Sequence, residues 1–194
     1  APADVAFGNI IKLRLTISED AGVVATDIKF KIQFSEYSDF SQGVTDVVAT
    51  TTCAVTSLWC YGNGTDNDDD AVITRVLSDS DVVGRHNETA TNASTFDPAA
   101  STPTEFEFTL KHSGATYNTT YFFRAYDVTT DKAVPLGAGE SYPSLSAQGV
   151  ALTFSVGGLG ASTAIEGITT DFETTAVAVP FGSLSIGTET EGAQ

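Results

Sequence analysis

A net charge of −16 on 194 residues, with a sequence pI of about 4.1, makes this chain strongly acidic. Nucleic acids and anionic membrane surfaces attract basic proteins, so this charge argues against both as partners. No apolar run approaches the roughly 18 residues of a membrane-spanning helix, which argues against direct insertion into a membrane.

Composition and patterning favour an all-β protein. Threonine and serine are abundant, methionine is absent, and no stretch has sustained helical periodicity. The length suits one large β domain, or a domain of about 150 residues with an appendage. Because methionine is missing and the chain begins Ala1-Pro2-Ala3, we expect a processed chain whose first residue was exposed by a signal peptidase.

Two runs within residues 9–37 alternate apolar and polar side chains. The apolar positions are Ile11, Leu13, Leu15 and Ile17 in the first run, and Ile28, Phe30, Ile32 and Phe34 in the second. Turn-like residues 19–22 separate the two runs. This pattern predicts antiparallel strands, each with one buried face and one solvent face.

The polar positions of these two runs hold four of the nine basic residues, namely Lys12, Arg14, Lys29 and Lys31. We expect the four side chains to share the outer face of the opening strands. Outward cations there would discourage edge-to-edge pairing, or would form one basic patch that meets the acidic surface of another copy. With either explanation, the patch is a candidate subunit contact.

Residues 38–104 are less regular. Residues 47–52 and 71–77 predict strands, and the acidic, glycine-rich segment 62–70 lies between them. Residues 78–104 predict a long polar connection on the surface, because a buried loop would leave backbone polar groups unpaired.

Regular alternation returns at residues 105–110 and 119–126, where Phe106, Phe108, Tyr121 and Phe123 are expected to face the core. The spacing of Thr119, Tyr121 and Phe123 resembles the penultimate strand of fibronectin type III and related immunoglobulin-like sandwiches. The resemblance implies that Tyr121 forms a tyrosine corner, tying its strand to a loop. The predicted fold is an antiparallel β-sandwich, either immunoglobulin/fibronectin III-like or jelly-roll-like.

Three regions follow from these patterns: residues 1–8 as a lead and candidate donor strand, 9–148 as the sandwich, and 149–194 as a β-rich tail. The tail holds too few apolar side chains for a core of its own. It is therefore expected to dock on the sandwich, on a neighbouring chain or on a continuation that has been removed. Its candidate contact residues are Val177, Val179 and Phe181.

Cys53 and Cys60 flank Trp59 and predict a disulfide, the alternative being two reduced, half-buried thiols. Closing so short a loop would add about 2.5 kcal/mol, enough to fix a loop but not the whole fold. Four asparagines stand in N-x-S/T sequons and predict glycosylation of a secreted protein, namely Asn63, Asn87, Asn92 and Asn118.

Five segments together resemble secreted, threonine-rich surface proteins of candidate-phyla bacteria with very small genomes. These segments are residues 11–15, 30–34, the Cys53–Cys60 loop, 121–124 and 179–184. The resemblance implies a secreted surface protein whose sequence continues past the position of Gln194. The sequons leave room for an archaeal surface protein of similar architecture.

The clearest candidate for a cofactor site is a calcium site formed by Asp66, Asp68 and Asp70. Carboxylates at alternate positions suit Ca²⁺, which takes six to eight oxygen ligands. The segment departs from the EF-hand pattern at Ala71, where that loop has glycine, and at Leu77, where it has glutamate. The alternative is a solvated acidic loop.

Catalysis has little support in the sequence. His86 and His112 are the two imidazoles, and there is no G-x-S-x-G nucleophile motif. Residues 157–160 lack the spacing and the helix of a dinucleotide site. We therefore expect the protein not to be an enzyme.

Two functions from different classes remain. The first is a structural subunit of an extracellular filament or surface layer, in which a terminal segment of one copy completes a sheet of the next. The donor would be residues 5–7 or 177–186. The second is an adhesin or glycan-binding module that uses Trp59 and Tyr61, with or without Ca²⁺.

Overall fold

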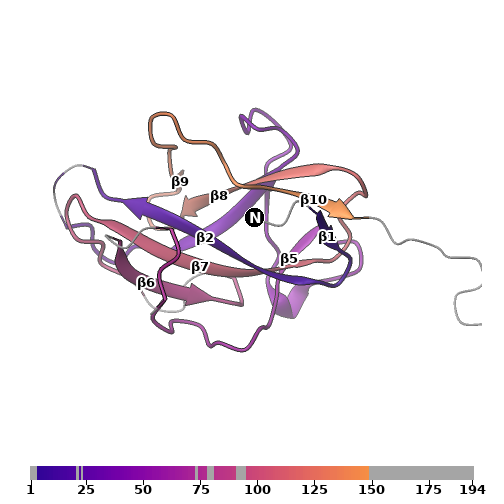
Figure 1. Cartoon of the computed structure of the whole chain (residues 1–194), viewed down its shortest axis with the longest axis horizontal. Coiled ribbons are helices and arrows are strands. Elements are labelled where there is room, and N and C mark those ends of the chain that lie inside the picture. The colour runs from indigo at the N-terminus through magenta and orange to yellow at the C-terminus, as the bar shows by residue number, and fades with distance from the viewer. Residues whose placement is uncertain are drawn as a thin grey trace, which may run out of the picture. The chain divides into compact units, whose positions relative to one another are not determined.

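The computed structural model of the chain describes residues 4–20, 22, 24–72, 74–77, 81–90 and 95–148. These residues belong to one unit, Ala1–Ala151, in which two β-sheets pack together (Figure 1). The described part contains one 3₁₀-helix, η1 (Thr50–Thr52), and no α-helix. The expected all-β sandwich is confirmed. The tail, with Val177, Val179 and Phe181, lies outside the described residues.

Sheet I has six strands in the order β1-β10-β8-β3-β4, with β9 pairing the end of β8. Its strands are β1 (Asp4–Ala6), β3 (Phe30–Ser35), β4 (Thr45–Asp46), β8 (Thr120–Asp127), β9 (Lys132–Ala133) and β10 (Ser144–Gln148). Sheet II has the order β2-β7-β5, with β6 also pairing β7. Its strands are β2 (Ile10–Ser18), β5 (Trp59–Tyr61), β6 (Val82–Asn87) and β7 (Pro103–His112).

The two opening runs supply β2 and β3, and their alternation is confirmed by the burial of Leu13 and Ile17 in one and of Phe30, Ile32 and Phe34 in the other. The expectation that they share an outer face was wrong. β2 pairs with β7 over nine positions in sheet II, whereas β3 pairs with β8 in sheet I. Each run therefore takes a partner distant in sequence, and the two apolar faces meet across the core.

The middle of the chain departs most from expectation. In place of a strand at 47–52 the structure has η1 and an isolated bridge between Val48 and Cys60. The described residues of 71–77 form no strand, although Ala71 bridges to Arg85. β6 instead lies within the predicted surface connection, where it pairs parallel with β7.

Two buried tyrosines tie the sandwich together through their hydroxyl groups. The Tyr61 hydroxyl in sheet II accepts a hydrogen bond from the Ile32 N–H in sheet I, at 2.8 Å. Burial raises the pKa of Tyr61, so its hydroxyl stays protonated. The Tyr121 hydroxyl accepts from the Thr116 N–H at 2.9 Å, which is the strand-to-loop contact predicted for it.

The predicted disulfide between Cys53 and Cys60 is present, with the two Cα atoms 5.8 Å apart. It joins β5 to the segment after η1. A disulfide fits an oxidising environment. Within the described ranges, no helix is long and apolar enough to cross a bilayer.

Candidate functional site

The outer face of sheet II is covered by residues 66–72 and 74–77, which follow β5 in the chain. β7 is consequently buried on both faces along most of its length. Phe106, Phe108 and Leu110 point into the sandwich core, while Glu105 and Glu107 alternate with them on the outer face. Two carboxylates thus lie where water is largely excluded, and each requires partners.

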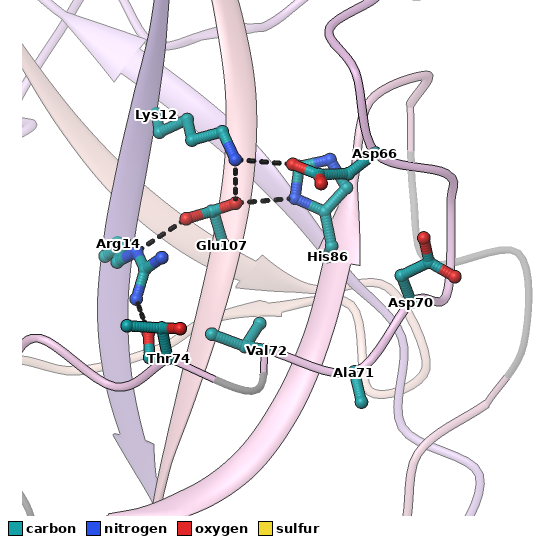
Figure 2. Close-up of a pocket in the computed structure, with 9 residues that line it drawn as sticks. All are labelled: Lys12, Arg14, Asp66, Asp70, Ala71, Val72, Thr74, His86 and Glu107. Atoms are coloured by element: carbon teal, nitrogen blue, oxygen red, sulfur yellow. Dashed lines mark hydrogen bonds and ion pairs between the residues drawn. The ribbon is translucent and has the colours of Figure 1, made fainter.

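Glu107 is the centre of a partly buried ionic network (Figure 2). Its Oε2 accepts from Arg14 Nε at 2.5 Å, and its Oε1 lies 3.0 Å from Lys12 Nζ. The same Oε1 is 2.8 Å from His86 Nδ1. Glu107 therefore joins β2, β6 and β7 through one carboxylate.

Glu105 holds the covering chain to the sheet. Its carboxylate accepts from Arg14 Nη1 at 2.7 Å and from the backbone N–H groups of Val76 and Leu77 at 3.0 and 3.1 Å. Burial alone would raise the pKa of Glu105. The hydrogen bonds from Arg14, Leu77 and Val76 outweigh it, so the pKa is lowered and the carboxylate stays charged.

His86 links Glu107 to a second group of acids. Its Nε2 lies 3.1 Å from Glu88 Oε1, and Glu88 Oε1 also accepts from the Asp66 N–H at 3.2 Å. The Asp66 carboxylate contacts Lys12, and this hydrogen bond lowers the pKa of Asp66 and raises that of Lys12. We call the seven residues Lys12, Arg14, Asp66, His86, Glu88, Glu105 and Glu107 the ionic cluster.

A pocket of about 490 Å³ opens onto the ionic cluster. Cluster members line one side, and the covering chain at Asp70, Val72 and Thr74 lines the other (Figure 2). The pocket therefore combines three carboxylates, of which that of Glu107 is buried, with an imidazole and two cations. Such a set of groups can hold a cation or a small polar ligand.

The predicted calcium site is not formed as expected, because the three aspartates are engaged separately. Asp68 accepts from the Glu88 N–H and the Thr89 hydroxyl, both at 2.6 Å. Asp70 accepts from the Asn67 N–H at 3.0 Å. Of the three, Asp66 alone belongs to a described group of ligand atoms that could hold a metal, with His86 and Glu88.

The predicted basic patch is also divided, since its members lie on different sheets. Lys12 and Arg14 belong to the ionic cluster on sheet II. Lys31, on β3 of sheet I, pairs with Asp46 at 2.6 Å and lies over the Tyr126 ring. Lys29 directly precedes that strand. The prediction of a single surface with all four cations was therefore wrong, because β2 and β3 are not neighbours.

Trp59 and Tyr61 are 0 % and 1 % exposed. Trp59 packs edge-on against Tyr121 and Phe123, and its ring also contacts His112. Stacking on a sugar requires an accessible ring face, so the role predicted for these two aromatics in glycan binding was wrong.

The predicted sequons differ in accessibility. Asn63 and Asn118 are exposed, whereas Asn87 lies in β6 and is 0 % exposed. A glycan could not be accommodated at Asn87 in this fold, which corrects that prediction. Asn92 lies outside the described residues.

Comparison of the chain with protein-family profiles, curated proteins and solved structures finds no match.

The lowered pKa of Glu105 predicts loss of stability in acid. A group whose pKa falls on folding stabilises the native state fully above its ordinary value, here 4.5. That contribution is lost as pH falls through the lower folded-state value. We expect urea midpoints to decline below about pH 4.5, and Glu105→Gln to flatten this decline. An unchanged pH profile in Glu105→Gln would contradict the assignment.

Proposed function

We propose that the protein is a structural subunit that self-assembles outside the cell, with one copy adding a strand to the sheet of the next. The observation that carries this proposal is the edge of β2. β2 is the first strand of sheet II, nine residues long, and in the described part of the chain it pairs with β7 alone. A long unpaired edge is a template for adding a strand from another chain.

Main-chain groups along this edge are directed away from the sheet. The Thr109 carbonyl accepts from the Gly62 N–H on the opposite side of β7. Its ladder partner Lys12 therefore points its own N–H and C=O away from β7. The alternation places Arg14 and Thr16 in the same orientation. An added strand would find a regular row of donors and acceptors there.

The proposed donor is residues 177–186 of another copy. The other predicted donor, residues 5–7, includes part of β1, which already pairs with β10 of its own sheet. Val5 is 2 % exposed within the core of its own chain. Pro180 in the proposed donor lacks an N–H, which is tolerated in a strand that pairs along one side.

The proposal includes an extracellular location, which the disulfide and two exposed sequons support. The disulfide suits an oxidising compartment. Exposed sequons at Asn63 and Asn118 could carry glycans on the surface of the sandwich. The acidic net charge would keep subunits soluble before they assemble.

Thr16→Pro tests the proposed edge. Proline at 16 removes an N–H that faces away from β7, so the β2–β7 ladder keeps its hydrogen bonds. Thr16→Val is the matched control, since each variant loses the Thr16 hydroxyl bond to Asp81. We expect electron microscopy and light scattering to show polymers for the wild type and Thr16→Val, and monomers for Thr16→Pro. Stable wild-type monomers at neutral pH would refute the function. Polymers of Thr16→Pro would refute this edge as the acceptor.

A further inference from the structure

We infer that Asp66, His86 and Glu88 form a binding site for a divalent transition-metal ion, with Zn²⁺ as the best match. The inference is independent of the proposed self-assembly. One ligand atom from each residue lies within 4.8 Å of the other two. Asp66 follows β5, His86 lies in β6 and Glu88 follows it, so the fold brings together residues from two segments.

Both nitrogens of the His86 ring face carboxylate oxygens. Nδ1 faces Glu107 Oε1 at 2.8 Å. An ionised carboxylate can accept only, so Nδ1 carries the proton. Nε2 faces Glu88 Oε1 at 3.1 Å, so in the absence of a metal this contact requires a second proton on the ring. A metal ion bound between these two atoms would replace that proton and accept a lone pair from each.

Thr109 offers His86 Nε2 only a weak alternative partner. Its hydroxyl lies 3.4 Å from His86 Nε2, a long distance for a hydrogen bond, and it leaves the facing Glu88 oxygen unchanged. His86 and Glu88 are 2 % and 3 % exposed. Bulk water therefore has little access to the two facing atoms.

The charges of the ionic cluster also call for a cation. Lys12 and Arg14 contribute +2, whereas Asp66, Glu88, Glu105 and Glu107 contribute −4. The sum is −2 when His86 is neutral, and three of these carboxylates are 3 % exposed or less. A surplus of buried negative charge is costly unless it is compensated. One divalent ion would neutralise the cluster.

The donor atoms select the class of metal. Calcium takes six to eight oxygen ligands, whereas an imidazole with two carboxylates suits Zn²⁺. Lys12 contacts Asp66 Oδ2, which leaves the other Asp66 oxygen for a metal. Glu107 would act as a positioning residue, since metal-binding histidines usually donate their second N–H to such a carboxylate. Three protein ligands leave a fourth position open toward the pocket.

Cobalt(II) and zinc binding to the full chain tests the inference. After removal of metals by chelation, we expect Co²⁺ to give a visible absorption band at one equivalent, and Zn²⁺ to displace it. His86→Gln and Glu88→Gln should abolish the band. Glu107→Gln, which removes the outer carboxylate, should weaken binding by about 10- to 100-fold. Native mass spectrometry should show one metal per wild-type chain.

Asp70→Asn is the matched control, because Asp70 lines the same pocket but is not one of the three ligands. It should bind Co²⁺ as the wild type does. Circular dichroism of Glu88→Gln, a near-isosteric change, separates loss of ligand from loss of fold. Equal weakening by Asp70→Asn and Glu88→Gln would overturn the site in favour of diffuse binding by the acidic loop. Nitrogen-15 spectra showing both His86 nitrogens protonated with Zn²⁺ present would also overturn it.

Discussion

Gly84→Ala is expected to lower the free energy of unfolding by about 3 kcal/mol. β6 and β7 pair in parallel with a shift in register between Val83 and His86, and Gly84 lies at this shift. A Cβ atom added there would lie 2.4 Å from the Glu105 carbonyl oxygen and 3.0 Å from a Thr104 methyl carbon. Backbone cannot move aside as a flexible side chain can, so β6 would be pushed from the sheet. Urea denaturation with the disulfide intact measures the loss.

Gly137→Ala is the matched control for this substitution. The nearest atom to its added Cβ is Glu140 Cγ at 3.4 Å, an ordinary contact, and its φ is not in the left-handed region. The change in unfolding free energy should stay within about 0.5 kcal/mol. Equal stability of the two alanine variants would contradict the close approach of the β6 backbone to β7 at Gly84.

Glu107→Ala is expected to cost about 3–5 kcal/mol, the range for removing one partner of a buried ion pair. The substitution leaves Arg14 without its 2.5 Å contact and His86 without its Nδ1 partner. Lys12 retains Asp66, and Arg14 retains Glu105. The cost therefore comes mainly from desolvated groups that lose their acceptor. Urea denaturation at neutral pH measures it.

Asp46→Ala is the corresponding change at the surface. Asp46 pairs with Lys31 at 2.6 Å, but their side chains are 50 % and 25 % exposed. Solvent screens such a pair, so its loss should cost no more than about 1 kcal/mol. Equal costs for Asp46→Ala and Glu107→Ala would mean that water reaches the ionic cluster freely.

The strands of the sandwich that have strict alternation could be predicted from the sequence. β2, β3, β7 and β8 each place apolar side chains at every second position, and this period alone defines their inward faces. Tyr121 could be placed through the spacing around it. Chain order does not say which strand pairs with which, so residues 12 and 31 were expected on one surface, whereas they lie on two sheets.

β5 and β6 could not be predicted, for a different reason. β5 has three residues, all buried, and β6 contains Gly84 and His86 in place of an alternating apolar pattern. Their strand conformation comes from pairing with β7, which supplies the backbone partners. Tertiary context of this kind overrides local propensity.

The ionic cluster was partly encoded in β2 and β7. Arg14 lies directly opposite Glu107 in the ladder, and opposite charges at such positions attract. Recognising that outward cations on one strand match outward acids on another would have predicted these pairs. Nothing in the sequence places His86 or Glu88 beside them, because the sequence of residues 62–90 has no regular alternation that would indicate their pairing.

β1 and β10 run parallel to each other, in register from Asp4 beside Ser146 to Ala6 beside Gln148. Tension applied before Asp4 and after Gln148 would slide the two strands past each other. Their inter-strand bonds would then be loaded together in shear, whereas unzipping would break them one at a time. This pair of strands is therefore arranged to resist stretching of the sandwich along its own chain, a property that would serve the self-assembly proposed above.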